Sequence, residues 1–138
     1  MTFFTVVIIV KTKNIKIKPR EKSGILKAVI ATMKAMAPAA LATIQAHFND
    51  LECSANDFDL IITGDLGQLG KDALLTMAQR KGISLGGKLV DCGTLVFDQM
   101  KQDVHAGGSG CGCSAITLCG YFLNRMRENK FKKIEIWG

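Results

Sequence analysis

Four glycines stand within six residues, between Gly107 and Gly112, and this cluster limits what the chain can fold into more than any other feature. Glycine loses more backbone entropy on folding than other residues, so such a cluster indicates a sharp bend or a close approach to the backbone. An amphipathic stretch follows directly, which makes the loop a helix entrance with unpaired N–H groups and a positive dipole end. Two interpretations stay open: a site for an anion, a carboxylate or an acyl oxygen, and a tight turn needed only for packing.

The glycine cluster matches neither common nucleotide-binding motif. It has no lysine, which a P-loop requires, and Cys113 stands where a dinucleotide-binding motif read from Gly108 needs its third glycine. Cys111 and Cys113 are separated by one residue, whereas zinc sites usually separate paired cysteines by two to four residues and add a second ligand pair. The sequence therefore predicts no nucleotide cofactor and no metal.

The net charge of +6 on 138 residues is unevenly distributed. Residues 1–34 hold eight Lys and Arg but a single acid, Glu21, so the remainder of the chain is close to neutral. No aromatic residues alternate with these lysines to stack on bases, which argues against nucleic-acid binding. Phe3–Val10 is largely apolar but too short to span a bilayer, and it lacks the basic start and cleavage site of a signal peptide. We expect a buried strand there and a cytoplasmic protein.

Strand patterns and helix patterns alternate along the chain, which predicts an α/β sheet with helices on its faces. Residues 20–36 are ambiguous and allow a helix, and Pro38 fits the first turn of one. The expected strands are Thr5–Lys11, a second around Ile15 and Ile17, then Asp57–Thr63, the short Lys88–Val90, Thr94–Phe97 and Phe131–Trp137; the expected helices run over 38–51, from Leu74 to near Gly82, and from Ile116 to Met126.

Polar residues follow two of the expected strands, where open α/β sheets bind their ligands. Gly64 and Asp65 come directly after one strand, and Asp65 could be a general base, a ligand contact or a helix N-cap. Asp91 and Cys92 lie at the next strand boundary, where Cys92 is either a nucleophile or, with nothing nearby to lower its pKa, an inert buried thiol.

The two histidines offer weaker candidates for chemistry. His105 precedes the glycine cluster and could act as an acid or base, whereas His47 on a helix is interpreted as a surface residue. Neither has a carboxylate partner that the sequence reveals.

Four segments occur in one order with sensible spacing: Met33–Phe48, Asp57–Gly70 (DFDLIITGDLGQLG), Val90–Phe97 (VDCGTLVF) and His105–Ala115 (HAGGSGCGCSA). Together they resemble the stage V sporulation protein AD family of spore-forming Firmicutes. The resemblance is good from about Met33 to Ile136. Residues 1–32 are interpreted as a divergent, strand-rich basic segment, and 33–138 as the family-like region.

The resemblance implies a thiolase-like, condensing-enzyme fold. Such proteins have two similar βαβαβαββ halves in a five-layered sandwich, and this chain resembles only the C-terminal half. The implied fold is a βαβαβαβ mixed sheet with helices on its faces, within a single incomplete domain over residues 1–138. The chain lacks the half that supplies the nucleophilic cysteine in condensing enzymes.

The resemblance also bears on catalysis. Condensing enzymes place a histidine after the strand that corresponds to Asp59–Thr63, where this chain has Gly64 and Asp65. They place a second histidine or an asparagine at the turn that corresponds to Asp91–Gly93, where this chain has neither. Without that acid–base pair an enolate or thioester oxyanion is not stabilised, so we expect no enzyme activity. Any activity that did exist would be that of a thiolase-like acyltransferase.

What the resemblance implies is binding of dipicolinic acid, a pyridine dicarboxylate loaded into the developing spore. The ligand would lie on the glycine loop, with the residues after the two strands at its rim. Asp65 would repel a dianion, so it could instead cap a helix or bind a bridging cation. The implied site residues are Gly64, Asp65, Asp91, Cys92, Gly107, Gly108, Ser109 and Gly110.

The implied partners are dipicolinate, other spore proteins of dipicolinate uptake, and either a missing N-terminal half or a second copy of the chain. The implied location is the cytoplasm, with peripheral attachment to the forespore inner membrane also open. Two alternatives remain: a condensing-enzyme relic that binds acyl-CoA or an acyl-carrier partner, and a non-functional gene fragment.

Half of a sandwich is expected to expose an apolar sheet face, which predicts self-association or a partner half. Light scattering measures this directly. A monodisperse monomer would contradict the expectation.

Overall fold

The computed structural model describes the backbone of residues 5–9, 22–98, 100–104, 107–108, 110 and 112–137, and within these the side chains from residue 35 onward. The expected second strand around residues 15–17 lies outside the described residues, as do His105, Ser109 and Cys111. The elements follow one another as β1 (Thr5–Ile9), α1 (Lys22–Asp50), η1 (Ala55–Asp57), β2 (Leu60–Thr63), α2 (Gly67–Arg80), β3 (Leu89–Asp91), α3 (Cys92–Leu95), α4 (Gly112–Thr117), η2 (Leu118–Phe122), α5 (Leu123–Arg127) and β4 (Lys133–Trp137).

The four described strands form one sheet in the order β1-β4-β2-β3. All three strand pairings are parallel, so the described sheet is a parallel α/β sheet and not the mixed sheet that the sequence suggested. Parallel strands need crossover connections, and here the helices supply them. Because the strands are parallel, the loops that follow β2 and β3 emerge at the same edge of the sheet.

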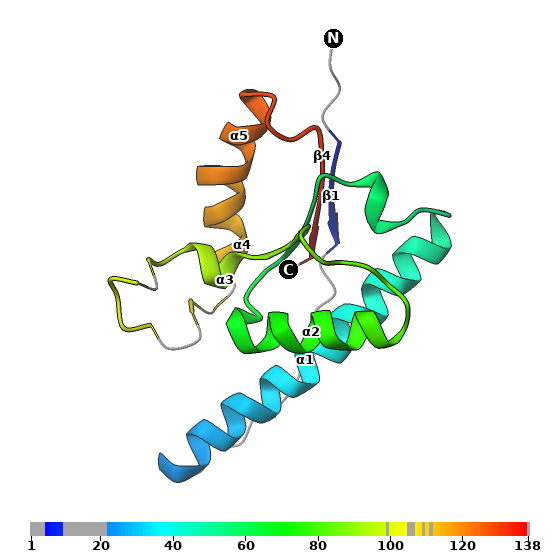
Figure 1. The fold of residues 1–138 in the computed structure, drawn as a ribbon. Coiled ribbons are helices and arrows are strands. Elements are labelled where there is room, and N and C mark those ends of the chain that lie inside the picture. The colour runs from blue at the N-terminus through cyan, green and yellow to red at the C-terminus, as the bar shows by residue number, and fades with distance from the viewer. Residues whose placement is uncertain are drawn as a thin grey trace.

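Helices cover both faces of the sheet (Figure 1). On one face α1 and α2 pack over Ile61, Leu89 and Trp137, and on the other α4 and α5 pack over Ile62, Ile134 and Ile136. The side chains of β2, β3 and β4 are buried or half-buried on both faces, as is usual for a parallel sheet covered by helices. The expectation of an exposed apolar sheet face is therefore wrong for these three strands. The exposed large apolar side chains lie mainly on α3, α4, η2 and the loop after α3 instead: Leu95, Phe97, Met100, Ile116 and Tyr121.

Helix α1 is much longer than the sequence suggested, because it begins at Lys22 and contains Pro38 in its interior. Pro38 therefore does not start the helix. The boundary that we drew between residues 32 and 33 falls inside α1, and residues 22–32 are helical rather than strand-like. The expected apolar stripe holds for Leu41, Ile44 and Phe48, which are buried, but Leu51 lies beyond the helix and is exposed.

Two further elements differ from expectation. Thr94–Phe97 is not a strand, because α3 begins directly after β3 and the chain then bends away. The helix over 112–127 contains a π-helical segment, η2, whose wider turn inserts one extra residue between buried positions. Its buried side chains are consequently Cys113, Thr117, Phe122 and Met126, while Ile116 and Cys119 of the expected stripe are exposed.

His47 is not a surface residue. It is 7% exposed and lies between α1 and the sheet, with its Nε2 atom 2.6 Å from Oε1 of Glu135 on the central strand β4. Glu135 is fully buried, although it stands between two isoleucines in a strand where polar and apolar residues alternate. Central strands of a doubly covered sheet have no solvent face, and this overrides the alternation.

Candidate functional site at the carboxyl edge of the sheet

The residues that the sequence singled out do come together, at the edge where β2 and β3 end. Gly64 and Asp65 follow β2, Asp91 closes β3, and Cys92 opens α3. The glycine loop reaches the same place, since the Gly110 N–H donates to Oδ2 of Asp65 at 2.9 Å.

Asp91 is the structural centre of this edge. Its carboxylate is completely buried and accepts three hydrogen bonds, from the Thr63 hydroxyl at 2.7 Å and from the N–H groups of Leu66 and Gly67 at 2.9 Å each. The N–H groups of Leu66 and Gly67 lie at the N-terminal end of α2, so this helix end already binds a carboxylate of the protein. Asp91 fixes the turn after β2, and its oxygens face the protein and not a ligand.

Cys92 lies in the core and not at the rim of a pocket. Its side chain is fully buried beneath α4 with Cys113 and Phe122. Burial raises the pKa of the Cys92 thiol to about 11. It outweighs the Thr117 side chain, which lowers this pKa, and the nearby Asp91 raises it by a smaller amount. A thiol in this state is not a nucleophile at neutral pH, which agrees with the inert interpretation.

The glycine loop packs directly against Gly93, at the start of α3. The Gly108 N–H donates to the Gly93 carbonyl at 2.7 Å, and a Cβ atom on Gly93 would lie 2.3 Å from the Gly108 carbonyl oxygen. Gly107 has a φ of +116°, and a Cβ atom there would lie 2.5 Å from the Gly93 carbonyl oxygen. Close backbone packing therefore accounts for Gly107 and Gly93, in line with the second interpretation of the cluster. A Cβ atom on Gly108 would instead meet side chains, the Phe97 ring at 3.1 Å and Cys113 Sγ at 3.4 Å.

The N–H groups of the described loop glycines already have partners. Gly107 donates to the Val104 carbonyl, Gly108 to Gly93, and Gly110 to Asp65. Of these three donors, Gly110 is the exposed one, and its acceptor is a half-buried carboxylate. Ser109, also expected to line the site, lies outside the described residues. Anion binding by these residues stays a prediction.

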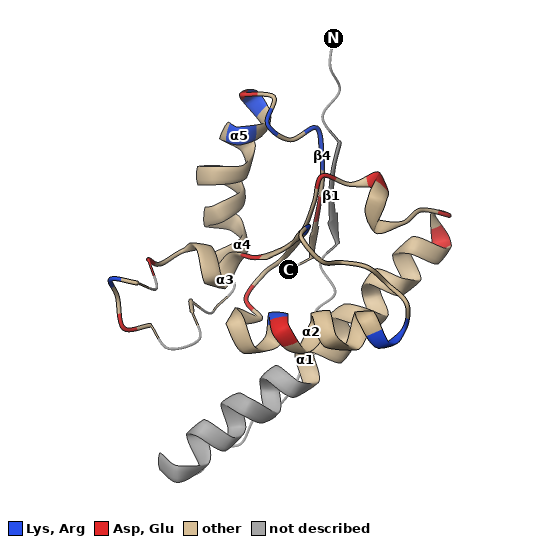
Figure 2. Ribbon diagram, viewed as in Figure 1, with Lys and Arg blue, Asp and Glu red and all other residues tan. Residues whose placement is uncertain are grey.

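The basic side chains that the structure describes gather mostly away from this edge. Figure 2 shows Lys and Arg gathered where α5 ends and β4 begins, which is the opposite edge of the sheet. No group of three or more His, Cys, Asp or Glu side chains suited to a metal occurs within the described part of the chain. No helix among the described residues is both long and apolar enough to cross a bilayer.

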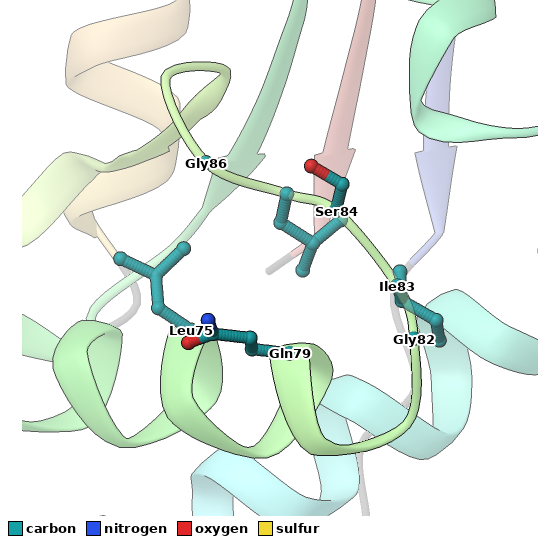
Figure 3. A pocket seen from close by; sticks show the side chains of 7 residues that line it. Leu75, Gln79, Gly82, Ile83, Ser84 and Gly86 are labelled. Carbon is teal, nitrogen blue, oxygen red and sulfur yellow. The ribbon is translucent and has the colours of Figure 1, made fainter.

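A separate hollow of about 480 Å³ lies where α2 gives way to β3 (Figure 3). Leu75 and Gln79 of α2 line one side, and Ile83 and Ser84 of the following loop line the other. None of the expected site residues contributes to it, and it carries no charged side chain.

Comparison with known proteins decides the family. The family model for stage V sporulation protein AD matches residues 15–137. The chain belongs to this family of sporulation proteins. Stage V sporulation protein AD of Bacillus subtilis (strain 168) is 43% identical over 100 residues, which cover 72% of this chain and 29% of that protein. The chain thus spans under a third of the length of this relative. The match also begins before Met33, within the segment that we had interpreted as divergent.

Within the family match, sequence reasoning missed two structural residues of the carboxyl edge. Thr63 binds Asp91, and Gly93 receives the glycine loop. Gly93 stood in the quoted VDCGTLVF segment, and its spacing from the glycine cluster was the available signal. The Asp65–Gly110 contact joins residues 45 positions apart, so no local pattern could have shown it.

Proposed function

We propose that this chain is a non-catalytic, thiolase-like part of a sporulation protein that binds dipicolinate and supports its uptake into the spore. The observation that carries the proposal is the contact between Asp65 and the Gly110 N–H, 2.9 Å long at an exposed point of the glycine loop. A loop N–H that holds a carboxylate of the protein has the geometry to hold a carboxylate of a ligand.

In this proposal the Asp65 carboxylate occupies the position that a carboxylate of the ligand takes when it binds. One carboxylate of the dicarboxylate takes over the Gly110 N–H when the Asp65 side chain turns away. Cys92 supports the absence of catalysis. It is the one described thiol that follows a strand at this edge, and burial keeps it protonated, so it does not act as a nucleophile. Asp91 is likewise occupied by three hydrogen bonds and has no free oxygen to act as a base.

The test is the Asp65→Asn substitution. It removes a negative charge beside the incoming dianion and weakens the internal competitor, so we expect dipicolinate to bind about tenfold more tightly, a gain of about 1.4 kcal/mol. Thermal unfolding with increasing dipicolinate measures this, since a ligand that binds only the folded state raises the melting temperature.

Asp72→Asn is the matched control, because Asp72 is an exposed aspartate of α2 whose carboxylate accepts a hydrogen bond from the Gln68 side chain, away from the glycine loop. It should leave dipicolinate binding unchanged. A shift with acyl-CoA but not with dipicolinate would replace the proposal by the condensing-enzyme relic. No shift with either compound in the wild-type chain would favour a fragment without binding activity of its own.

A further inference from the structure

Four buried polar atoms between α1 and β4 lack a hydrogen-bond partner of good geometry among the described residues: Nε2 of His47, both carboxyl oxygens of Glu135, and Nε1 of Trp137. The groups are nevertheless close together. His47 Nε2 lies 2.6 Å from Glu135 Oε1, and the His47 ring meets the Trp137 ring edge-on with centroids 5.1 Å apart. Unpaired buried polar atoms are costly and call for an explanation.

The surroundings of this cluster are apolar. The Phe48 and Phe58 rings lie 6.4 and 6.3 Å from the His47 ring, and Ile61 is buried in the same core. In such a place an isolated charge is strongly disfavoured, whereas a pair with zero net charge is tolerated. Two charge distributions satisfy this condition, a neutral acid beside a neutral imidazole and a carboxylate beside an imidazolium. Both hold one proton.

We propose that His47 and Glu135 share a single proton and thereby join helix α1 to the central strand as a pH-sensitive latch. The latch is closed while the pair is neutral overall. Removing the shared proton leaves a buried carboxylate, and adding a second leaves a buried imidazolium. Either charge favours separation of α1 from the sheet. This inference is independent of dicarboxylate binding, which involves the carboxyl edge.

Among the side chains that the structure describes, few charged groups face the pair. Asp50 on α1 raises the pKa of His47, and Lys133 on β4 lowers it, but burial outweighs both and the pKa of His47 is lowered overall. Lys133 also lowers the pKa of Glu135, as does the adjacent Trp137 side chain. Burial again dominates and raises the pKa of Glu135 to about 7. The last described titratable group near the pair is the half-buried Cys53 thiol. Glu135 and Asp57 help to raise its pKa.

The two shifts have opposite consequences for stability. Because the pKa of Glu135 is raised, this residue adds to the free energy of unfolding. The added stability is fully present below its ordinary pKa of 4.5 and is lost as the pH rises through about 7. The lowered pKa of His47 gives a contribution that is full above its ordinary pKa of 6.5 and is lost as the pH falls. Between those ordinary values the folded pair and the unfolded chain each hold one proton, so the two slopes cancel. Above 6.5 the unfolded chain has released its proton first, and stability falls until Glu135 also ionises.

The chain carries its own reporter, because Trp137 is its single tryptophan and touches His47. We expect Trp137 fluorescence to be constant from pH 5 to 6.5 and to change in one step above that range. Glu135→Gln should abolish the step and give a free energy of unfolding that rises from pH 5 to 7. For His47→Gln the free energy of unfolding should fall from pH 5 to 7. In the double variant it should neither rise nor fall over that range.

Glu52→Gln is the matched control, since Glu52 is an exposed glutamate. It should behave like the wild type. Identical pH profiles for the wild type and both single variants would overturn the proposal. If a variant does not fold, NMR of the wild type decides, with His105→Gln to assign its signals. His47 resonances that change between pH 4.5 and 6.5, as those of a solvated imidazole do, would also overturn it.

Discussion

Replacing Asp91 with alanine should lower the free energy of unfolding by about 3 to 5 kcal/mol. The substitution leaves three donors, Thr63 Oγ1 and the N–H groups of Leu66 and Gly67, without their acceptor in a place that water does not reach. Each unsatisfied buried donor costs about 1 to 3 kcal/mol, and the start of α2 also loses the negative charge at its positive end. Urea unfolding followed by circular dichroism measures the loss.

Two companion variants separate the carboxylate's role from a general effect of losing an acid. Asp91→Asn keeps the size and one acceptor oxygen but presents an amide donor to another donor, so its loss should be intermediate. Asp72→Ala removes an exposed aspartate and should change stability by less than about 0.5 kcal/mol. An Asp91→Ala protein as stable as the Asp72→Ala protein would show that Asp91 does not hold this edge together.

Gly93→Ala should cost about 3 kcal/mol, a large effect for the addition of one methyl group. The new Cβ atom would lie 2.3 Å from the Gly108 carbonyl oxygen, which is backbone and cannot turn aside as a flexible side chain would. The glycine loop must therefore move, and with it the 2.7 Å hydrogen bond from the Gly108 N–H to Gly93. Overpacking of this kind usually costs about 1 to 3 kcal/mol, and here the backbone contact adds to it.

Gly120→Ala makes the same chemical change where nothing lies within 4 Å of the new atom. Gly120 also stands in a helical segment, so this variant should be neutral or more stable by up to about 1 kcal/mol. Equal stability of the two alanine variants would refute the close-packing explanation. The Cβ atom on Gly93 would also lie 3.0 Å from Asp91 Oδ1, so Gly93→Ala and Asp91→Ala should not be additive.

Local patterns were enough to find most of the strands and helices. The runs of β-branched residues in Thr5–Ile9, Leu60–Thr63 and Lys133–Trp137 are all strands, and the helix ending near Gly82 is α2. These segments have the local propensity of the element that they form, so tertiary packing did not change their secondary structure. The family resemblance, drawn from motifs in fixed order, was confirmed by the family model and by the relative from Bacillus subtilis.

The errors fall where tertiary contacts overrode a local signal. Pro38 is a favourable first-turn residue, yet α1 continues through it, with buried Ala37 and Leu41 on either side. Thr94–Phe97 has strand-like residues, but the chain must turn directly after Asp91 so that Gly93 can receive the glycine loop. In the helix from Gly112 the π-helical segment shifted the buried face by one residue, which no period of 3.6 foresees.

For the candidate site, the sequence located the right loops but not the role of each residue. It placed Asp65 and Asp91 after two strands, where open α/β sheets bind ligands, and the family resemblance added the glycines to them. It could not tell that Asp91 faces inward to three donors while Asp65 faces outward to Gly110. Adjacent loops present such residues to different surroundings, and only the packed structure distinguishes them.

The sequence by itself determined the family and the α/β class, because these follow from motifs and from propensities that act over a few residues. It left both interpretations of the glycine cluster open, and the packing of Gly107 against Gly93 became clear only from the structure. Only the tertiary structure decided that His47 and Glu135 meet in the core, that the described sheet is wholly parallel, and that Asp65 occupies the Gly110 N–H. Each of these depends on residues tens of positions apart. Burial and charge at such contacts are set by the packing of whole elements and not by the local pattern of either partner.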